Sequence, residues 1–418
     1  MPRSESSPLL HGNVSETNST TPMSPFIARL YGENEPSWIR SMKFFLGSWI
    51  NILLLFIPLS GMAHYLVWDA GLRFLFSFIA IIPLARLLGE ATEQLSLPLG
   101  QTIGGLLNAS FGNAVEIIVG ITALLHGEVR IVQTSMLGSI LSNLLLVLGM
   151  SFFAGGLVTH ENEFSTTAAQ TSASLMTLSC ITLIIPAAYH ATMEAKADST
   201  PPLSKLLVAP MVEIDNTAES GLLIISRGTS VLLLMVYVGY LVFQLKTHAD
   251  LFRPPPSQAQ EEEEQESMSM ISAAISLLSV TVITSFCADW LVASIEETAE
   301  KYDIPKTFIG LILLPLVANA AEHVTSVWMA MKNKMELTIG ISLGSSIQIA
   351  AFVVPLLVIV GWIIDRDLTL FFANFETTVL SVSVLLVNLL IQDGKSNYME
   401  GLMLITLYIV IALAFWVS

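Results

Sequence analysis

Long apolar stretches without charged residues recur along this chain, and they limit what it can fold into. The first runs from Phe44 to Trp68 and contains no Asp, Glu, Lys or Arg. A helix needs about 20 such residues to cross the hydrocarbon core of a bilayer. Because lipid offers no hydrogen-bond partners to the backbone, such a segment must satisfy its own polar groups as a helix. The sequence therefore predicts a protein of membrane-spanning helices.

Charge-poor windows predict about eleven spans. The windows lie near residues 44–66, 70–90, 99–126, 131–157, 165–190, 222–245, 268–294, 306–331, 335–362, 369–391 and 399–418. Only 12% of the residues are charged, against roughly 25% in soluble proteins. No strand-like alternation dominates, so the predicted fold class is an all-α membrane protein.

The net charge and the cysteines exclude other classes of function. A formal charge of -16 argues against nucleic acid as a partner, because binding to phosphate requires Lys and Arg. Cys180 and Cys287 lie inside apolar segments, where we expect small apolar residues rather than a disulfide or a metal site. We expect no cofactor, and we expect the lipid bilayer and the transported ions as partners.

Polar segments divide the chain into parts. Residues 1–43 are rich in Ser, Thr, Pro and Asn and are predicted to be a disordered cytosolic tail. The segment Lys246–Ser267 contains three consecutive prolines and an acidic run, and it separates two halves. The predicted order is the tail, an extra N-terminal helix at 44–66, a first five-helix repeat at 70–245, an acidic cytosolic linker or helix at 246–267, and a second five-helix repeat at 268–418.

The two halves share one register. Glu116 ends the sequence GNAVE and Glu322 ends ANAAE, at an offset of 322 − 116 = 206. The same offset pairs Gly104 with Gly310, and Leu-Gly-Ser at 137–139 with Leu-Gly-Ser at 343–345. An odd number of helices per half turns the second half over in the membrane. This is the inverted-repeat plan of secondary transporters, whose ion site lies near the midplane.

Glu116 and Glu322 are the central candidates for ion binding. Each is the only acid in a long apolar span. Burying an ionised carboxylate at such a depth costs at least about 2 kcal/mol, so the residue needs a compensating role. The alternative is a neutral glutamate that is hydrogen-bonded for packing.

Neighbouring oxygen groups extend this candidate cation site. Asn113 and Asn319 stand three residues before the glutamates, where a helix places them on the same face, and Gly112 and Ala318 leave room for an ion. The following helix of each half adds hydroxyl and amide groups at Ser139, Ser142, Ser345 and Gln348. Hard oxygen donors suit Ca²⁺, which takes about 6–8 of them. The alternative for the Ser, Asn and Gln side chains is hydrogen bonding between helices.

Two facing carboxylates also suggest proton coupling. Desolvation and mutual repulsion prevent both from ionising easily, and a divalent cation removes that repulsion. Protons and Ca²⁺ then compete for the same oxygens, which is the coupling rule of an antiporter. His323, next to Glu322, either relays protons or hydrogen-bonds a neighbouring helix.

Further acids lie near helix ends or in the linker. Those near helix ends either form access routes for the ion or are solvated at the membrane edge; they are Glu90, Glu93, Glu296, Glu297 and Glu300. The acidic run of the linker either collects or senses Ca²⁺ or is a solvated segment; it comprises Glu261, Glu262, Glu263, Glu264 and Glu266.

The N-terminal tail carries signals for location and orientation. Glu5, Leu9 and Leu10 fit an acidic dileucine sorting signal, which a sorting adaptor would read and which points to an endosomal or vacuolar membrane. Arg40 and Lys43, with two arginines further upstream, precede the first span, so the N-terminus is predicted to be cytosolic. Eleven spans would then place the C-terminus on the luminal side.

The doubled motif resembles a known family. GNAVE at 112–116 and NAAEH at 319–323 are similar to the paired signature motifs of the vacuolar Ca²⁺/H⁺ exchangers, the cation/proton exchanger branch of the Ca²⁺/cation antiporter superfamily. The resemblance extends from about residue 40 to the end of the chain. It implies proton-driven Ca²⁺ export from the cytosol into an acidic vacuole, with Glu116 and Glu322 as alternating ligands for Ca²⁺ and H⁺, and it matches residues 261–266 to the family's acidic helix. Ala318 departs from the family, which usually has glycine there, and its methyl group is expected to narrow the site slightly.

Three alternatives remain open at the level of the sequence. Mn²⁺/H⁺ or Na⁺-coupled Ca²⁺ exchange would use the same oxygens, although the first-repeat motif of Na⁺/Ca²⁺ exchangers has no match here. A cation channel usually builds its filter from several subunits, whereas these acids come from two halves of one chain. An intramembrane hydrolase would need a nucleophile with a base, or paired acids with a water path, and no such enzyme pattern occurs. We therefore predict a Ca²⁺/H⁺ antiporter that works by alternating access, and not an enzyme.

Overall fold

The computed structural model describes residues 36–198, 211–249 and 267–417. Their regular secondary structure is helical apart from two short strands, which confirms the all-α prediction. The sorting-signal residues Glu5, Leu9 and Leu10 and the acidic run at 261–266 lie outside the described residues.

The first half begins with an angled helix. Helix α2 (Trp38–Leu46) bends by 85° into a combined helix at Trp49–Tyr65, which contains the 3-10 segment η1 (Trp49–Leu55) and α3 (Phe56–Tyr65). The rest of this half consists of α4 (Ala70–Ser96), η2 (Leu97–Leu99), α5 (Gly100–Phe111), α6 (Ala114–Leu125), α7 (Val129–Leu141), η3 (Ser142–Val147), α8 (Leu148–Val158), α9 (Thr166–Asp198), α11 (Met211–Val242) and η4 (Phe243–Thr247).

The second half has a matching order of elements. It consists of α13 (Met270–Tyr302), α14 (Lys306–Phe308), η6 (Ile309–Leu313), α15 (Leu314–Ala318), α16 (Ala320–Met331), α17 (Met335–Gln348), η7 (Ile349–Val353), α18 (Val354–Ile363), α19 (Asn374–Leu390) and α20 (Tyr398–Trp416). The strand β1 (Asn162–Glu163) of the first half pairs antiparallel with β2 (Lys395–Ser396). In both halves a broken helix precedes a helix with one π-helical turn, η3 or η7.

Seven of the described helices are long and apolar enough to cross a bilayer, and there are up to ten spans if each of three bent pairs counts as one. The bent pairs are residues 38–65, 103–125 and 306–331. Helix α19 is a further apolar helix of 10–17 residues. The number of eleven spans stays a prediction.

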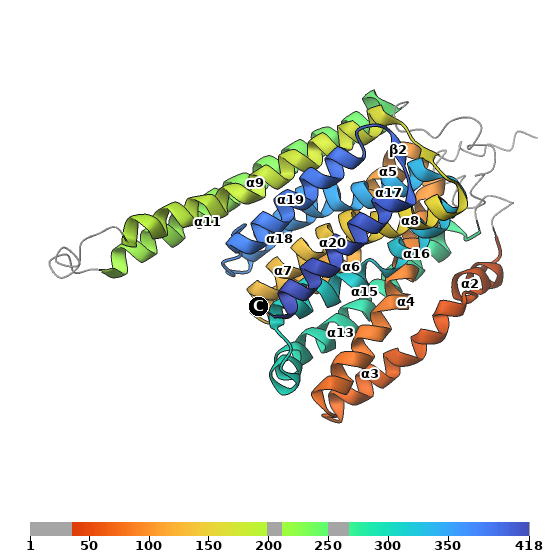
Figure 1. The fold of residues 1–418 in the computed structure, drawn as a ribbon. Helices are drawn as coiled ribbons and strands as arrows, with labels where there is room; N and C mark the ends of the chain where they lie inside the picture. The colour runs from red at the N-terminus through yellow and green to blue at the C-terminus, as the bar shows by residue number, and fades with distance from the viewer. Residues whose placement is uncertain (1–35, 199–210, 250–266, 418) are drawn as a thin grey trace, which may run out of the picture. The chain divides into compact units, whose positions relative to one another are not determined.

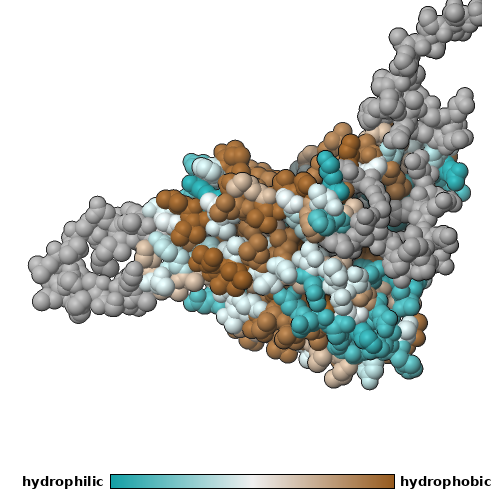
Figure 2. All heavy atoms as spheres, turned by 90° about the horizontal axis from the view of Figure 1, so that it is seen from above, coloured by the Kyte–Doolittle hydropathy of each residue, from teal (hydrophilic) through white to brown (hydrophobic). Residues whose placement is uncertain are grey.

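The long helices pack in antiparallel pairs. Helix α4 runs along α13, with α3 beside them, and α8 packs along α20 (Figure 1). Helices α9 and α11 lie side by side and reach beyond the ends of α18 and α19 (Figure 1). Figure 2 shows broad hydrophobic areas on the outer surface, which suits contact with lipid because soluble proteins rarely expose large apolar patches.

Close approach of α8 and α20 depends on glycine. At Gly401, a Cβ atom would meet the backbone of Phe153 and Gly149 on α8. We expect Gly401→Leu to lower the free energy of unfolding by about 1–3 kcal/mol, because the added atoms force two helix backbones apart. The midpoint temperature of detergent-solubilised protein measures this. Gly239→Leu on α11 is the matched control, because nothing lies within 4 Å of a Cβ atom there, and equal midpoints for the two variants would contradict the packing argument.

Asp69 ties the start of α4 to the end of α13. Its carboxylate accepts hydrogen bonds from the Gly71 backbone at 3.0 Å and the Tyr302 hydroxyl at 2.7 Å, and it pairs with Lys301. The hydrogen bond from Lys301, followed by that from Tyr302, lowers the pKa of Asp69 to about 2.

The lowered pKa of Asp69 gives a pH prediction. The contribution of this carboxylate is present above its ordinary pKa of 3.8 and is lost as the pH falls towards about 2. We expect Asp69→Asn to reduce the drop in thermal midpoint that the wild-type protein shows across this interval. Identical pH profiles of the two proteins between these values would contradict this role.

Candidate ion-binding site

The two glutamates lie in the first turns of helices that begin at breaks. Helix α6 starts after α5 with a bend of 44°, and α16 starts after α15 with a bend of 57°. Asn113 and Asn319 occupy the breaks, with φ −108°, ψ 35° and φ −88°, ψ 11°. The expectation that each asparagine shares a continuous helix with its glutamate is therefore wrong. The physical reason is that both amides bond to other segments, which holds these residues out of the helix.

The breaks bring helix ends to Glu116 and Glu322. Each glutamate lies in the first turn of its helix, where the partial positive charge of the N-terminus favours a carboxylate. The preceding helices end there too, and the last carbonyl groups of a helix have no partner within it. Broken helices of this kind provide both anion-friendly and cation-friendly backbone groups at a membrane midplane.

A chain of amide and hydroxyl groups connects the first break to the second half. The Asn113 amide donates to Gln348 Oε1 at 2.6 Å. Ser345 Oγ donates to Asn113 Oδ1 at 3.0 Å. Asn143 Nδ2 in turn donates to Ser345 Oγ at 2.8 Å.

The second break completes the chain. Asn319 Nδ2 donates to Asn143 Oδ1 at 3.1 Å and to the Ser139 carbonyl at 3.3 Å. The network thus runs from one broken helix through α17 and η3 to the other, and it fixes the two breaks relative to each other.

Asn143 is the member of this network that sequence reasoning missed. It is fully buried and joins Ser345 to Asn319. A signal was present, because Asn143 is a lone amide followed by a run of leucines, and polar residues inside spans are rarely without a role. The repeat register does not identify it, since the position 206 residues later is Ile349.

The two carboxylates lie close enough for their charges to interact. Glu116 is buried, with 4% of its surface exposed, and Glu322 is partly buried. Ser345 and Asn143 lie near the Glu322 carboxylate. Within the described part of the chain, Glu322 Oε2 and Asn319 Oδ1 are buried acceptors without a donor, so both oxygens remain for a cation or, at Glu322, a proton.

A large cavity gives access to both glutamates. This vestibule has a volume of about 660 Å³, and the residues lining it include Glu93, Asn108, Glu116, Glu322 and Glu336. Its walls reach the end of α4, the start of α9, the end of α11 and the start of α17. It therefore extends toward the side of the molecule on which α11 ends and α13 begins, which we call the vestibule side.

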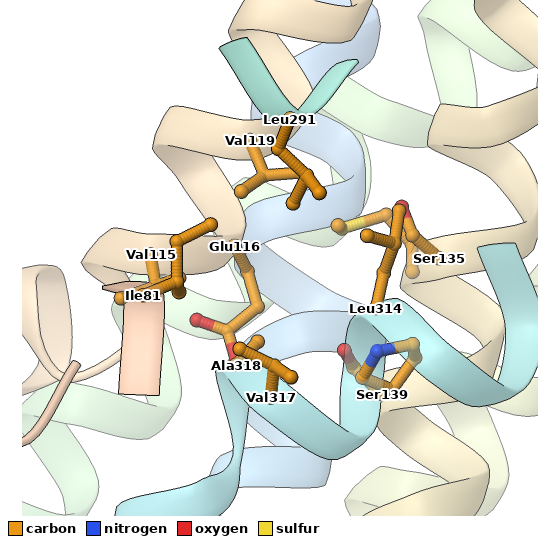
Figure 3. A pocket seen from close by; sticks show the side chains of 12 residues that line it. Ile81, Val115, Glu116, Val119, Ser135, Ser139, Leu291, Leu314, Val317 and Ala318 are labelled. Carbon is orange, nitrogen blue, oxygen red and sulfur yellow. The ribbon is translucent and has the colours of Figure 1, made fainter. Parts of the chain in front are cut away.

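A much smaller cavity adjoins Glu116. This chamber, of about 20 Å³, is lined by twelve residues (Figure 3), of which only Glu116, Ser135 and Ser139 are polar. Figure 3 shows the Glu116 carboxylate beside Ala318, with Val119 and Leu291 together at one end. A volume of this size holds about one water molecule.

The structure brings most predicted site residues together. Those lining the vestibule are Gly112, Glu116, Ala318, Glu322, Ser345 and Gln348, and Ser139 lines the chamber. Ser142 lines neither cavity; it is buried beside Tyr408. His323 is buried, and its Nδ1 lies 2.7 Å from the Asn319 carbonyl. Because a carbonyl only accepts, Nδ1 carries the hydrogen.

The additional acids do not gather at one place. Glu93 lines the vestibule, and Glu90 pairs with Arg86 at 2.9 Å. Glu297 pairs with Arg73, at the opposite end of the α4–α13 pair. At that same end Glu296 pairs with Lys306 at 2.7 Å and Glu300 is exposed.

Comparisons with known proteins identify the family. Residues 70–246 and 272–417 match the model of the sodium/calcium exchanger protein family. The chain belongs to this family. It is 48% identical to the vacuolar calcium ion transporter of Schizosaccharomyces pombe over 89% of this chain and 85% of that protein. It is 42% identical to vacuolar cation/proton exchanger 2 of Oryza sativa subsp. japonica over 88% and 81% of the two chains.

A solved structure agrees with this family assignment. The Ca²⁺/H⁺ antiporter protein YfkE superposes with a TM-score of 0.70 at 32% identity, covering 88% of this chain and 99% of that one. Together with the apolar helices, these matches establish a multi-pass membrane protein of the exchanger family, which is a class of transporters.

The position of Asn143 yields a test of the network. In Asn143→Leu, Ser345 and Asn319 lose a hydrogen-bond partner in a buried site, so we expect a stability loss of about 1–3 kcal/mol and a weaker apparent affinity for the transported cation. Thermal unfolding in detergent and ion flux measure the two effects. Ser346→Ala is the matched control, because this buried hydroxyl bonds only the Ser342 carbonyl of its own helix among the described contacts. Equal flux in both variants would contradict a role for the network in transport.

Proposed function

We propose that this chain exchanges cytosolic Ca²⁺ for luminal H⁺ across a vacuolar membrane. The observation that carries the proposal is the meeting of Glu116 and Glu322, from two separate broken helices, at one cavity. The names of the relatives support Ca²⁺ and protons as the ions: one is a calcium ion transporter, one a cation/proton exchanger and one a Ca²⁺/H⁺ antiporter.

The ion site consists of the two carboxylates and the oxygens around them. Glu116 and Glu322 bind Ca²⁺ when both are ionised and carry protons when the ion is absent, because the two charges can coexist only with a cation between them. Gly112, Ala318, Ser345 and Gln348 surround the ion from the vestibule. Asn113, Asn319 and Asn143 hold the breaks in place, and the Asn319 oxygen is free to bind the ion.

Proton exchange with water involves His323 in this proposal. Its Nε2 is buried without a partner among the described residues, one position from Glu322. The imidazole therefore has a nitrogen available to take up a proton from the carboxylate region.

Orientation follows from the charges before the first long span. Arg40 and Lys43 lie on α2, so the positive-inside rule puts the N-terminus in the cytosol. The combined helix 49–65 then crosses away from the cytosol and α4 returns to it, which places the vestibule side in the cytosol. The parts of the chain are an extra N-terminal helix, two inverted five-helix repeats and an acidic linker between them.

The decisive experiment is ⁴⁵Ca²⁺ uptake into sealed proteoliposomes with an acidic interior, in Na⁺-free buffer. We expect uptake that a protonophore abolishes. Uptake that ignores the pH gradient but follows a Na⁺ gradient would favour Na⁺ as the counter-ion, which is the ion in the family's name. Competition by Mn²⁺ in the same assay measures cation preference.

The same assay tests the two glutamates. We expect Glu116→Gln and Glu322→Gln each to reduce proton-driven uptake to the level of protein-free liposomes, since an amide neither ionises nor carries the exchanged proton. Glu300→Gln is the matched control, because Glu300 is an exposed acid that lines neither cavity. Full exchange by a correctly inserted Glu116→Gln or Glu322→Gln protein would disprove this site.

A further inference from the structure

The small chamber and the large vestibule are built from equivalent positions of the two halves. Of the twelve residues that line the chamber, ten have a partner in the vestibule lining exactly one repeat length, 206 positions, away. Examples are Glu116 with Glu322 and Ser139 with Ser345. Further chamber members of this set are Val115, Val119, Ser135, Leu291, Leu314 and Ala318. The chamber is therefore the counterpart of the vestibule in the other half of the repeat.

Equivalent helices border the two cavities, α7 at the chamber and α17 at the vestibule. The first is packed tightly against its neighbours, and the second is not. A Cβ atom at Gly138 on α7 would meet the Leu311 carbonyl and Pro315, so α7 lies directly against η6 and α15. The equivalent Gly344 on α17 has nothing within 4 Å and lines the vestibule. One half of the repeat is thus closed at the point where the other is open.

An ion pair lies across the closed half. Arg130 on α7 pairs with the buried Glu376 at the start of α19, and Gln133 donates to the Thr369 carbonyl at 3.0 Å. The repeat equivalent of Arg130 is Glu336, which lines the open vestibule. The open half therefore has an acid at the position where the closed half has a base.

The linings also differ in their oxygen content. Leu314 and Val119 of the chamber correspond to Asn108 and Thr325 of the vestibule. Figure 3 shows the leucine and valine side chains in the chamber near Glu116. A cation in this half would therefore meet fewer oxygen ligands than in the vestibule.

We propose that the chamber is the closed half of the ion route and leads from Glu116 to the side opposite the vestibule. Because Leu314 and Val119 line it, this half binds a divalent cation with lower affinity than the vestibule half. The proposal rests on the proposed function, because it takes Glu116 as a ligand of the transported ion. It deepens that function by assigning residues that set the affinity of each face. In an inverted repeat the second state exchanges the conformations of the halves, so the chamber widens when the vestibule closes.

Cysteine labelling tests the route. Asn108→Cys and Leu314→Cys are introduced into full-length protein with Cys180→Ala and Cys287→Ala, and a membrane-impermeant thiol reagent is added to sealed vesicles of known orientation. We expect the cysteine at 108 to react from the vestibule side without any gradient. The cysteine at 314 should react only from the opposite side, and only while Ca²⁺ and a pH gradient drive exchange.

Two results would overturn this assignment of the route. One is reaction at position 314 from the vestibule side. The other is no reaction at 314 while the same vesicles exchange ions. If wild-type vesicles show no proton-driven Ca²⁺ exchange at all, the proposed function fails instead, so the two failures are distinguishable.

A substitution tests the affinity difference. Leu314→Asn gives the chamber the amide that the vestibule has at position 108. We expect the apparent affinity for Ca²⁺ at the opposite face to rise by about tenfold, as one added oxygen ligand to a charged ion would produce, with the vestibule face unchanged. Leu313→Asn, which lines neither cavity, is the matched control. An unchanged affinity at the opposite face in a folded, exchanging Leu314→Asn protein would overturn the role of Leu314.

Discussion

A helix that is broken inside a bilayer leaves backbone groups without partners, and the rest of this site depends on how that cost is met. Lipid supplies no hydrogen bonds at this depth. Here bonds between side chains offset that cost: the side chains of Asn113 and Asn319, the residues at the breaks, bond to amides and hydroxyls from α17 and η3. The same amides that stabilise the breaks also surround the carboxylates, so structural support and ion binding use one set of side chains.

This arrangement explains why the acids of the site come from sequence-distant helices. Each break places one glutamate at a helix start, and the network joins the starts of α6 and α16. The vestibule then brings water to Glu322, which is partly exposed, while Glu116 is buried deeper and borders the chamber as well. The two carboxylates are equivalent in the repeat but not in their access to solvent.

Much of this could be predicted from the sequence, because span length and the repeat register are properties of the sequence itself. The apolar windows predicted the helices, and the repeat offset predicted Glu116 and Glu322 as the central pair of carboxylates.

Hydrophobicity does not show where a helix breaks, since Gly112, Asn113 and Asn319 are compatible with a continuous helix in a pattern of apolar residues. The repeat register does not point to Asn143, because its equivalent is Ile349, whereas it does point to Ser142, whose equivalent is Gln348, although Ser142 lies beside Tyr408. Which half is open depends on packing at Gly138 and Gly344, which side-chain identity alone does not encode.

Val115, Glu116 and Ala318 line both the vestibule and the chamber, so the partition between the two cavities is about one layer of side chains thick. Water in a wide vestibule carries the electrical potential of its own side deep into the protein. Most of the transmembrane voltage then falls across this thin partition and the closed half beyond it. Moving one elementary charge through the full voltage is worth about 2.3 kcal/mol per 100 mV. When the charge of the cation carried one way differs from that of the protons carried the other way, the membrane voltage changes the free energy of exchange. It acts mainly at the partition that Val115, Glu116 and Ala318 form.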